Sequence, residues 1–406
     1  MMWEIAKLGD ISRNIQTGPF GSQLHQSDYS ESGIPVVMPK DLVGGKISEE
    51  SIARVDKTHV ERLCRHKIET GDILYSRRGD VGRCAYVTKK EEGWLCGTGC
   101  LRVTIASEKA DSRFVFFQLQ HPDTVGWVEK HAVGATMLNL NTTILSSVSI
   151  RLPALEIQKR IADILSAYDD LIENNQKQIK LLEEAAQRLY KEWFVDLHFP
   201  GHEDTKIVDG VPEGWQYEKL GDLVKTTSGG TPSRRKSEYY VNGNIRWIKT
   251  KELNDGFIFE TEEHITEDAV KNSSAKVLPE GALIVAMYGA TIGKIGITAA
   301  EMACNQACCA FISFDDMISK EYLYCWLMDN REYLVSQGKG AAQSNLSQDM
   351  IRNFSILCPD KKVMKIFTEI VTTMLENKRV LENKILILSE ARDDLLPKLM
   401  SGEVEV

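Results

Sequence analysis

The chain repeats one plan of construction. "WEIAKLGD" occupies residues 3–10 and "WQYEKLGD" occupies residues 215–222 of the 406 residues. Further stretches match in the same order: "IPVVMPKDL" (34–42) with "IRWIKTKEL" (245–253), "GDILYSRRGDVG" (71–82) with "GALIVAMYGATIG" (281–293), "CGTGC" (96–100) with "CNQAC" (304–308), and "SIRLPALEIQKRIADIL" (149–165) with "SILCPDKKVMKIFTEIV" (355–371). The separation of matched residues drifts from 212 to 206. Two diverged copies of one large unit give such a drift, whereas a solenoid repeat has a short period.

The first part of each copy has a mixed pattern. Short apolar runs such as "DILYS", "CAYVT", "LRVTI" and "ALIVAMY" predict strands, and Gly with Asn or Asp between them marks turns. The stretches "SRFVFFQLQ" and "KEYLYCWLMD" predict short helices. We therefore expect the fold class α+β, with two mixed α/β domains of roughly 150 residues each.

The second part of each copy predicts a long helix. Apolar residues recur in a 4-3 rhythm over residues 161–193 and again over 363–395, which is the heptad stripe of a helix that packs on another helix. Each stripe contains one asparagine, Asn175 or Asn377, and the second also contains Lys384. These polar residues are either lapses in the stripe or residues that set the register of the helix pair, and both interpretations stay open.

The reach of the linker predicts how the two helices pair. Each helix spans about 60 Å at 1.5 Å per residue. The chain between Phe194 and Trp215 extends at most about 65–70 Å, so a parallel pair, which needs the chain to return the full helix length, leaves almost no slack. We therefore expect an antiparallel coiled coil with a pseudo-two-fold internal repeat.

Composition and missing motifs exclude several functions. The net charge is −9, divided as +1 over 1–152, −3 over 153–200, −6 over 201–358 and −1 over 359–406, so any nucleic-acid face must be a local patch. No run of about 20 apolar residues predicts a membrane span. Nine irregularly spaced cysteines indicate a reducing cytoplasm. No phosphate loop, dinucleotide fingerprint, H-E-x-x-H or G-x-S-x-G is present, so we expect no catalytic residue and no cofactor.

Two cysteine pairs occupy equivalent positions in the copies, Cys96/Cys100 and Cys304/Cys308. Structural zinc needs four ligands, and each copy lacks a second well-spaced pair. Burial as small side chains on strands is therefore the preferred interpretation, and we predict no metal site.

The order of these motifs resembles the specificity (S) subunit of type I restriction–modification enzymes over almost the whole chain. The resemblance is carried by "W…KLGD" and "PEGW…KLGD", "SGGTPSRRKSEYY…IRWIKTKEL", "GDILYSRRGDVG", "GALIVAMYGATIGK", "LP…EIQKRIADIL", "LYKEWFVDLHFPG" and "LLPKLMSGEVEV". It implies two target-recognition domains that each read one half of a bipartite double-stranded DNA sequence. It also implies spacer helices on which two methyltransferase subunits dock, and restriction/translocase subunits that complete the complex.

The resemblance sets the expected domain organisation. The expected order is target-recognition domain 1 over 1–152, spacer helix 1 over 153–197, a linker over 198–214, target-recognition domain 2 over 215–358, and spacer helix 2 with a C-terminal tail over 359–406. The first copy departs from the family pattern, since "QTGPFGSQLHQSDYSESG" lacks the "GGTPSR" form of the second. That departure is expected if the copies read different bases.

The residues predicted to touch DNA are cations for phosphates and polar side chains for base edges. In the first copy they are Ser22, Gln23, His25, Lys40, Arg77, Arg78 and Arg83. In the second copy they are Ser228, Thr231, Arg234, Arg235, Lys236, Tyr239, Arg246, Lys249, Lys251, Tyr288, Thr291 and Lys294. The alternative interpretation of both sets is a solvated surface, because exposed Lys and Arg are common.

Three other functions remain to be weighed against a DNA-specificity subunit. The chain itself could modify DNA or RNA, which the missing motifs disfavour. It could be a coiled-coil scaffold with two protein-binding domains. It could also serve a solitary methyltransferase as its DNA-binding subunit.

Overall fold

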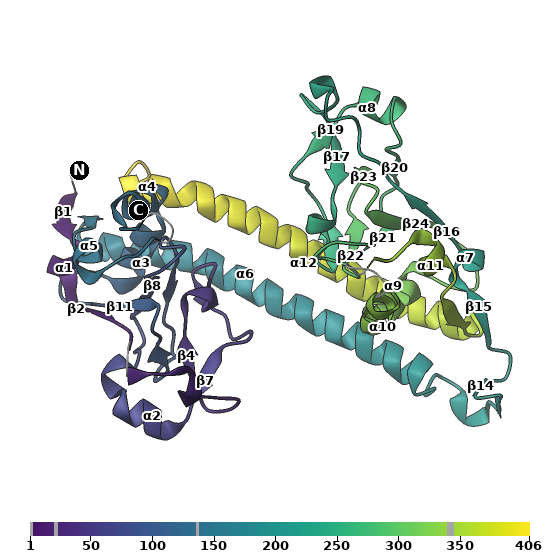
Figure 1. The fold of residues 1–406 in the computed structure, drawn as a ribbon, viewed down its shortest axis with the longest axis horizontal. Helices are drawn as coiled ribbons and strands as arrows, with labels where there is room; N and C mark the ends of the chain where they lie inside the picture. The colour runs from purple at the N-terminus through teal and green to yellow at the C-terminus, as the bar shows by residue number, and fades with distance from the viewer. Residues whose placement is uncertain (1–2, 20–22, 135–137, 339–344) are drawn as a thin grey trace. The chain divides into compact units, whose positions relative to one another are not determined.

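The computed structural model describes residues 3–19, 23–134, 138–338 and 345–406. It divides into two compact units, Met1–Asp170 with Leu388–Val406, and Leu171–Ile387. Two long helices, α6 (Leu155–Tyr190) and α12 (Lys361–Ser401), contribute residues to both units (Figure 1). Each unit is described by itself below.

The first unit is built from the first copy of the repeat. Its strands are β1 (Glu4–Lys7), β2 (Ser12–Thr17), β3 (Tyr29–Ser30), β4 (Ile34–Val37), β5 (Leu42–Val43), β6 (Lys46–Ile47), β7 (Ala53–Val55), β8 (Ile73–Ser76), β9 (Cys84–Tyr86), β10 (Leu95–Cys96), β11 (Cys100–Ile105) and β12 (Ser149–Leu152). Its short helices are α1 (Leu8–Ile11), α2 (Lys57–Arg62), α3 (Ser112–Gln120), α4 (Pro122–His131) and α5 (Thr142–Ser146).

The second unit repeats this order. Its strands are β13 (Ile207–Val208), β14 (Val211–Pro212), β15 (Gln216–Lys219), β16 (Val224–Ser228), β17 (Ile245–Ile248), β18 (Gly256–Ile258), β19 (His264–Ile265), β20 (Val277–Leu278), β21 (Leu283–Ala286), β22 (Ile295–Thr298), β23 (Met302–Cys304), β24 (Cys308–Phe314) and β25 (Ser355–Cys358). Its short helices are α7 (Leu220–Leu223), α8 (Glu267–Lys271), α9 (Lys320–Asp329), α10 (Arg331–Gln337) and α11 (Gln348–Arg352). The predicted α+β fold and its duplication are confirmed element by element.

The "KLGD" motif lies where the first and last parts of each copy meet. In the first copy β1 pairs antiparallel with β12, and the N–H of the buried Leu8 donates to Val148 O at 2.8 Å. In the second copy β15 pairs with β25, and the N–H of Leu220 donates to Phe354 O at 2.9 Å. A Cβ at Gly221 would lie 2.8 Å from the Cβ of Arg352, so a larger residue would push the two ends apart. The motif therefore closes each domain before its long helix begins.

Each domain contains two larger sheets beside its two-stranded ones. The strand orders are β2-β11-β8-β9 and β10-β4-β7-β3 in the first unit, and β16-β24-β21-β22-β18 and β19-β17-β23-β20 in the second. All four side chains of β21 are buried, because successive residues point to opposite faces and both faces are covered. Leu283 and Val285 face one hydrophobic cluster, whereas Ile284 and Ala286 face another.

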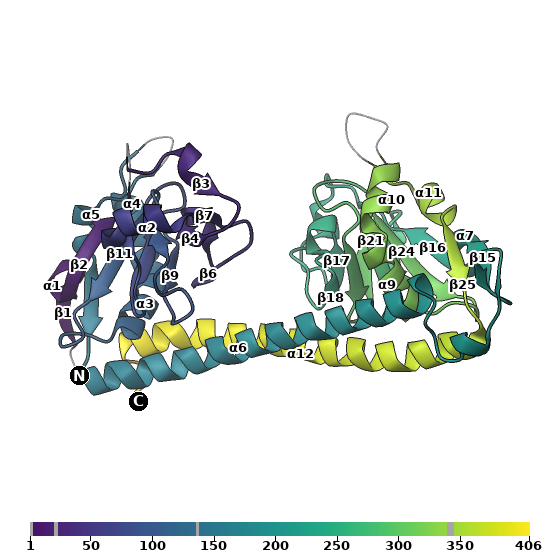
Figure 2. The ribbon, with the colours of Figure 1, turned by 90° about the horizontal axis from the view of Figure 1, so that it is seen from below.

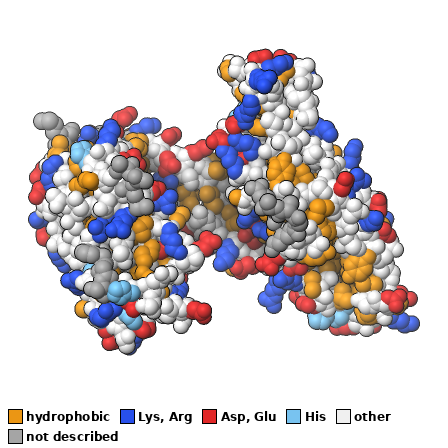
Figure 3. Space-filling model, in the orientation of Figure 1, with side chains coloured by type: hydrophobic (Ala, Val, Ile, Leu, Met, Phe, Trp, Pro, Cys, Tyr) orange, Lys and Arg blue, Asp and Glu red, His pale blue; other side chains and the backbone are white. Residues whose placement is uncertain are grey.

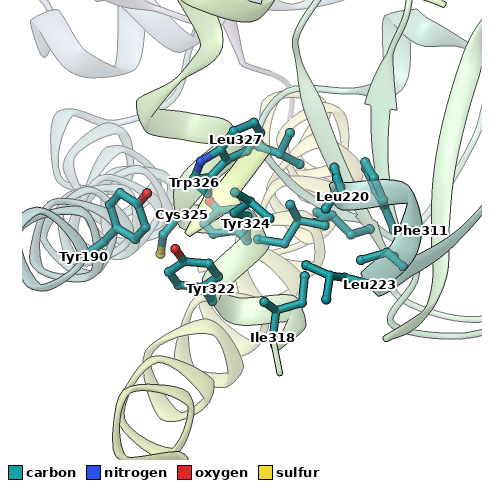
Figure 4. Packing of buried hydrophobic residues seen from close by; sticks show 14 of the residues in the cluster. Tyr190, Leu220, Leu223, Phe311, Ile318, Tyr322, Tyr324, Cys325, Trp326 and Leu327 are labelled. Atoms are coloured by element: carbon teal, nitrogen blue, oxygen red, sulfur yellow. The ribbon is translucent and has the colours of Figure 1, made fainter. Parts of the chain in front are cut away.

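Helix α9 carries the core of the second unit. Ser319 caps its N-terminus by accepting the N–H of Tyr322 at 3.1 Å, just as Asp111 caps α3 in the first unit. Figure 4 shows the side chains of α9 lying between Tyr190 of α6 and Phe311 of the sheet. This aromatic packing positions the sheet on the long helices.

The long helices run antiparallel in each unit, as the linker reach predicts. In the first unit Leu165 near the start of α6 shares a core with Leu399 near the end of α12. In the second unit Phe194, in the π-helical turn that follows α6, stacks edge-on against Phe367 near the start of α12, with ring centroids 4.9 Å apart. Figure 2 shows α6 and α12 side by side beneath α9 and β25 of this unit.

The predicted polar positions of the helix stripe are only partly buried. Asn175 is buried, whereas Asn377 and Lys384 are exposed, and the buried polar residue of α12 is Lys378. This part of α12 packs on the globular domain as well as on α6, so two partners decide which side is buried. Asn377 and Lys384 line a shallow groove between the two helices. Register roles for Asn175 and Asn377 stay predictions.

Lys378 is the centre of a buried ionic cluster in the second unit. Its side chain is 1% exposed, and its Nζ donates to Glu183 Oε1 at 2.6 Å, to Asp255 O at 2.5 Å and to Tyr324 OH at 3.1 Å, while Glu382 Oε1 lies at 3.7 Å. Burial lowers the pKa of Lys378, but the hydroxyl of Tyr324 and the carboxylates of Glu382 and Glu183 outweigh it and hold the pKa above its ordinary value. The lysine is therefore charged and ties both helices to the domain.

We expect the Lys378→Met substitution to destabilise the second unit by about 3–5 kcal/mol, because it leaves partly buried carboxylates without their cation. Hydrogen exchange of α9 measures the loss. The Lys384→Met substitution on the same helix is the matched control and should change exchange little, since Lys384 is exposed. Equal protection in both variants would show that the cluster does not hold the domain on the helices.

Candidate nucleic-acid interface

Three backbone segments of the second copy meet at one edge of its domain. They are the turn after β16 (229–231), the turn after β21 (287–288) and the turn that leads from β23 in one sheet to β24 in the other (305–307). The N–H of Gly230 donates to Cys304 O at 3.0 Å, and that of Met287 donates to Ala307 O at 2.8 Å. A Cβ at Gly229 would lie 1.8 Å from Cys304 O, so only glycine allows the approach. We call these segments the three-loop edge.

The first copy builds the same edge from residues 18, 77–78 and 97–99. The N–H of Gly18 donates to Cys100 O at 3.0 Å, and that of Arg77 donates to Gly99 O at 2.8 Å. A Cβ at Gly18 would lie 1.9 Å from Gly97 O. Short hydrogen bonds and glycine contacts therefore hold one rigid frame in both copies.

The side chains that this frame presents differ between the copies. Arg78 forms an isolated β-bridge with Asn139, and Tyr288 forms the equivalent bridge with Asn345. The turn between the matched cysteines carries Thr98 in the first copy, where the second has Gln306. The two copies thus present different hydrogen-bonding groups at the same places.

Most predicted cations of the second copy lie in an ionic network. Arg234 pairs with Glu263 at 2.6 Å, and Lys249 lies 2.8 Å from Glu262 and 2.6 Å from Glu263. Arg246 pairs with Glu260 and Lys251 with Glu262. On the face seen in Figure 3, Lys and Arg of this unit lie among Asp and Glu. The region is therefore a charge-paired surface rather than a continuous basic patch.

Arg234 is held on three sides. Its guanidinium lies over the rings of Tyr240, 4.4 Å from the centroid, and Trp247, 5.2 Å from the centroid. Its hydrogen bond to Glu263 is the main cause that lowers the pKa of that carboxyl to about 2. Arg235 beside it is exposed and, within the part of the chain that the structure describes, makes no ion pair.

The remaining predicted residues of the second copy divide between surface and interior. Thr231 is exposed on the three-loop edge and Ser228 is half-buried. Lys236 Nζ donates to the hydroxyl of Tyr239, whose side chain is buried. Thr291 is half-buried, with its hydroxyl oxygen inaccessible to solvent.

Lys294 belongs to a structural cluster. Its Nζ lies 2.7 Å from the carboxylate of Asp255, which also accepts from Arg331 and from the N–H of Ile295. Burial raises the pKa of Asp255, but these hydrogen bonds outweigh it and hold the pKa below its ordinary value. Asp255 adopts φ +72°, so the turn that carries it needs this support.

The predicted residues of the first copy lie on several loops. Ser22 lies outside the described residues, Gln23 is half-buried and His25 is exposed. Lys40 Nζ donates to Ser51 O at 2.8 Å, and Arg83 pairs with Asp80 at 2.5 Å. Arg77 is half-buried and Arg78 is exposed on the three-loop edge.

Sequence reasoning missed the side chains in the turns between the matched cysteines. The "CGTGC" and "CNQAC" stretches were considered only for their cysteines, and all four of these thiols are buried. Burial raises the pKa of Cys96 to about 12, so it is an inert thiol. Among the described residues no group of three His, Cys, Asp or Glu is arranged to hold a metal ion. The available signal was the pair of differing residues, Thr98 and Gln306, between matched cysteines.

The chain thus holds two copies of a loop-bearing α+β domain, whose matched edges carry different side chains. A family model described as the type I restriction modification DNA specificity domain matches residues 2–184 and 212–387. The chain belongs to this family and is a DNA specificity subunit of the type I restriction–modification class, a non-catalytic component.

Curated relatives cover the whole chain. The MjaIX specificity subunit of Methanocaldococcus jannaschii is 27% identical over 414 residues, which span 100% of this chain and 94% of that protein. The HindI specificity subunit of Haemophilus influenzae is 26% identical and covers 99% of both. The crystal structure of the S subunit from M. genitalium superposes with a TM-score of 0.66 at 16% identity, covering 98% of this chain and 96% of that one, and shows the same fold. In the described part of this chain no helix is long and apolar enough to cross a membrane.

Proposed function

We propose that each copy reads one half of a bipartite target in double-stranded DNA through its three-loop edge. The observation that carries the proposal is the pair of similar frames with different side chains at matched places, Thr98 in the first copy against Gln306 in the second. Sequence is read by hydrogen bonds to base edges, whereas phosphate contacts supply position and affinity. Two unlike half-sites require different base-contacting side chains, and these can be carried on the same backbone frame.

The long helices supply the second part of the proposal. They set the number of unread base pairs between the half-sites and offer docking faces to two methyltransferase subunits. In the second unit a shallow groove lined by Leu181, Leu182, Val380 and Leu381 leaves apolar side chains of both helices exposed, with Leu181 64% exposed. Restriction/translocase subunits join through this assembly. A scaffold that binds only proteins would also use such a groove, but it has no need of differing hydrogen-bonding groups on two matched edges.

The test of the function is the methylated motif of the host cell. Modification-sensitive sequencing of DNA from cells that carry this chain with its partner subunits should find two short, different half-sites at a fixed spacing. Cells in which the gene is deleted should lose that motif. Persistence of the motif after deletion would refute the proposal.

Two exposed arginines should supply phosphate contacts. We expect Arg235→Ala, and separately Arg78→Ala, to weaken DNA binding by the methyltransferase complex for all sequences and to reduce the salt slope by about one. Arg234→Ala is a poorer test, because it also removes the stacking on Tyr240 and Trp247. Filter binding across a salt series measures the effect, with exposed Lys89→Ala as the control. If Arg235→Ala and Arg78→Ala behave like the control, the DNA lies on another face.

A further inference from the structure

Gln306 lies in the turn that joins β23 of one sheet to β24 of the other. The flanking residues Cys304 and Cys308 are fully buried, while Gln306 is exposed. The N–H of Asn305 donates to Ile248 O at 2.9 Å, and the side chain of Asn305 accepts the N–H of Ala307 at 3.0 Å. Asn305 therefore shapes the turn, and the side chain of Gln306 points away from the domain.

The amide of Gln306 is oriented by its neighbours on the three-loop edge. The hydroxyl of Thr231 donates to Gln306 Oε1 at 2.6 Å, so the other arm of the amide must be the NH₂ group. Burial raises the pKa of Tyr288, and a hydrogen bond from Gln306 opposes that rise, as donation from the amide to the phenol oxygen does. The amide oxygen of Gln306 then keeps one free lone pair as an acceptor, and its NH₂ group keeps one free N–H as a donor.

This pair of free groups has a matching partner in DNA. In the major groove adenine offers its N6 amino group as a donor and N7 as an acceptor, and a glutamine amide pairs with both at once. Guanine offers two acceptors at the same edge, so it would face the amide oxygen with a second acceptor. An amide fixed in one orientation therefore discriminates between the two purines.

The first copy lacks this group at the equivalent place. Thr98 occupies the matched turn between β10 and β11, and its hydroxyl hydrogen-bonds to Tyr29. A hydroxyl both donates and accepts from a single atom, so it suits either type of base edge. The difference between Thr98 and Gln306 thus assigns a purine preference to one copy only.

We propose that Gln306, positioned by Thr231 and Tyr288, is a specificity-determining residue that reads one adenine of the second half-site from the major groove. The proposal rests on the function proposed above. It predicts a change at one position of one half-site and no change elsewhere.

The test uses the complex of the full chain with its methyltransferase subunits. DNA bound from a library randomised over both half-sites is sequenced for the wild type, Gln306→Met and Gln306→Glu. Methionine keeps the volume of the side chain and removes the amide, so preference for adenine at one position should fall about tenfold or more. Glutamate accepts from the N4 amino group of cytosine, so Gln306→Glu should shift that position toward cytosine.

Two control variants separate reading from folding. Gln176→Met changes an exposed glutamine on α6 and should leave both half-sites as they are. Thr98→Val changes the first copy and should leave the second half-site unaltered. If Gln306→Met selects the same second half-site as the wild type, the inference is wrong while the proposed function stands. The inference is also wrong if Gln306→Met weakens binding equally for all sequences. If the wild type itself selects no bipartite sequence, both the proposed function and the inference about Gln306 are wrong.

Discussion

A seven-residue insertion at matched points of both long helices will abolish high-affinity binding to the original target. The insertion points are between Gln178 and Ile179 in α6 and between Lys384 and Ile385 in α12, which leave the Lys378–Glu183 contact intact. One heptad keeps the apolar stripe in phase and adds about 10 Å at 1.5 Å per residue. That length corresponds to about three base pairs, which rotate the DNA by about 100°. The second reader then faces the wrong side of the duplex.

A three-heptad insertion at the same points should rescue binding at a longer spacer. It adds about 31 Å, close to one turn of DNA, so the half-sites return near their original phase with about nine more base pairs between them. Selection from a library with randomised spacer length measures both insertions in the complex with methyltransferase subunits. Half-site identity should not change. Selection of the original spacer by either variant would show that the helices do not set the distance.

The fold was predictable because the apolar patterns that identify its strands and helices are local in the sequence and occur in both copies. Alternating and fully apolar runs identify strands such as β8 and β21, and a capped apolar stretch identifies α9. Each assignment made in one copy is checked by the other. The antiparallel direction followed from the length of the linker, which is a property of the chain alone.

The charge pairing of the second copy was not predictable from its sequence. Arg246 and Lys249 were predicted as DNA contacts because cations suit phosphates. Their partners belong to "ETEEH", about 14 residues away, and reach them because β17 pairs antiparallel with β19 in the register Arg246↔His264. Strand pairing at this range depends on tertiary packing, so a count of charges along the chain does not predict which cations are paired. Whether these cations also contact DNA stays a prediction.

The burial of Lys378 in α12 was not predicted, for a related reason. Heptad reasoning assumes that a helix buries one stripe against one partner. Lys378 is buried because Asp255 O and Tyr324 approach α12 from the globular domain, which the helix sequence does not encode. Gln306 was not predicted as a site residue because the contact that orients its amide comes from Thr231, 75 positions earlier in the chain.

Exchange of the second domain for that of a related specificity subunit will change the second half-site and leave the first half-site and the spacer as they are. The structure defines the segment to exchange as residues 215–358. It contains β15 and β25 together, whose register Gln216↔Cys358 to Lys219↔Ser355 closes the domain. An exchange that ends at residue 355 would divide this pair between two parents and weaken the closure.

The graft must also keep the contacts that hold the domain on the helices. Asp255 and Tyr324 bind Lys378, and Tyr322 packs on Tyr190 with ring centroids 5.6 Å apart. We expect a graft that keeps these three domain residues to bind DNA as tightly as its parents, because the helices meet the same surface. Restoring Asp255, Tyr324 and Tyr322 in a graft that lacks these residues should recover DNA binding without altering the second half-site. Methylome sequencing of cells that carry each graft measures the outcome. A graft that changes both half-sites together would show that the two domains do not read independently, since each is closed by its own strand pair and carries its own three-loop edge.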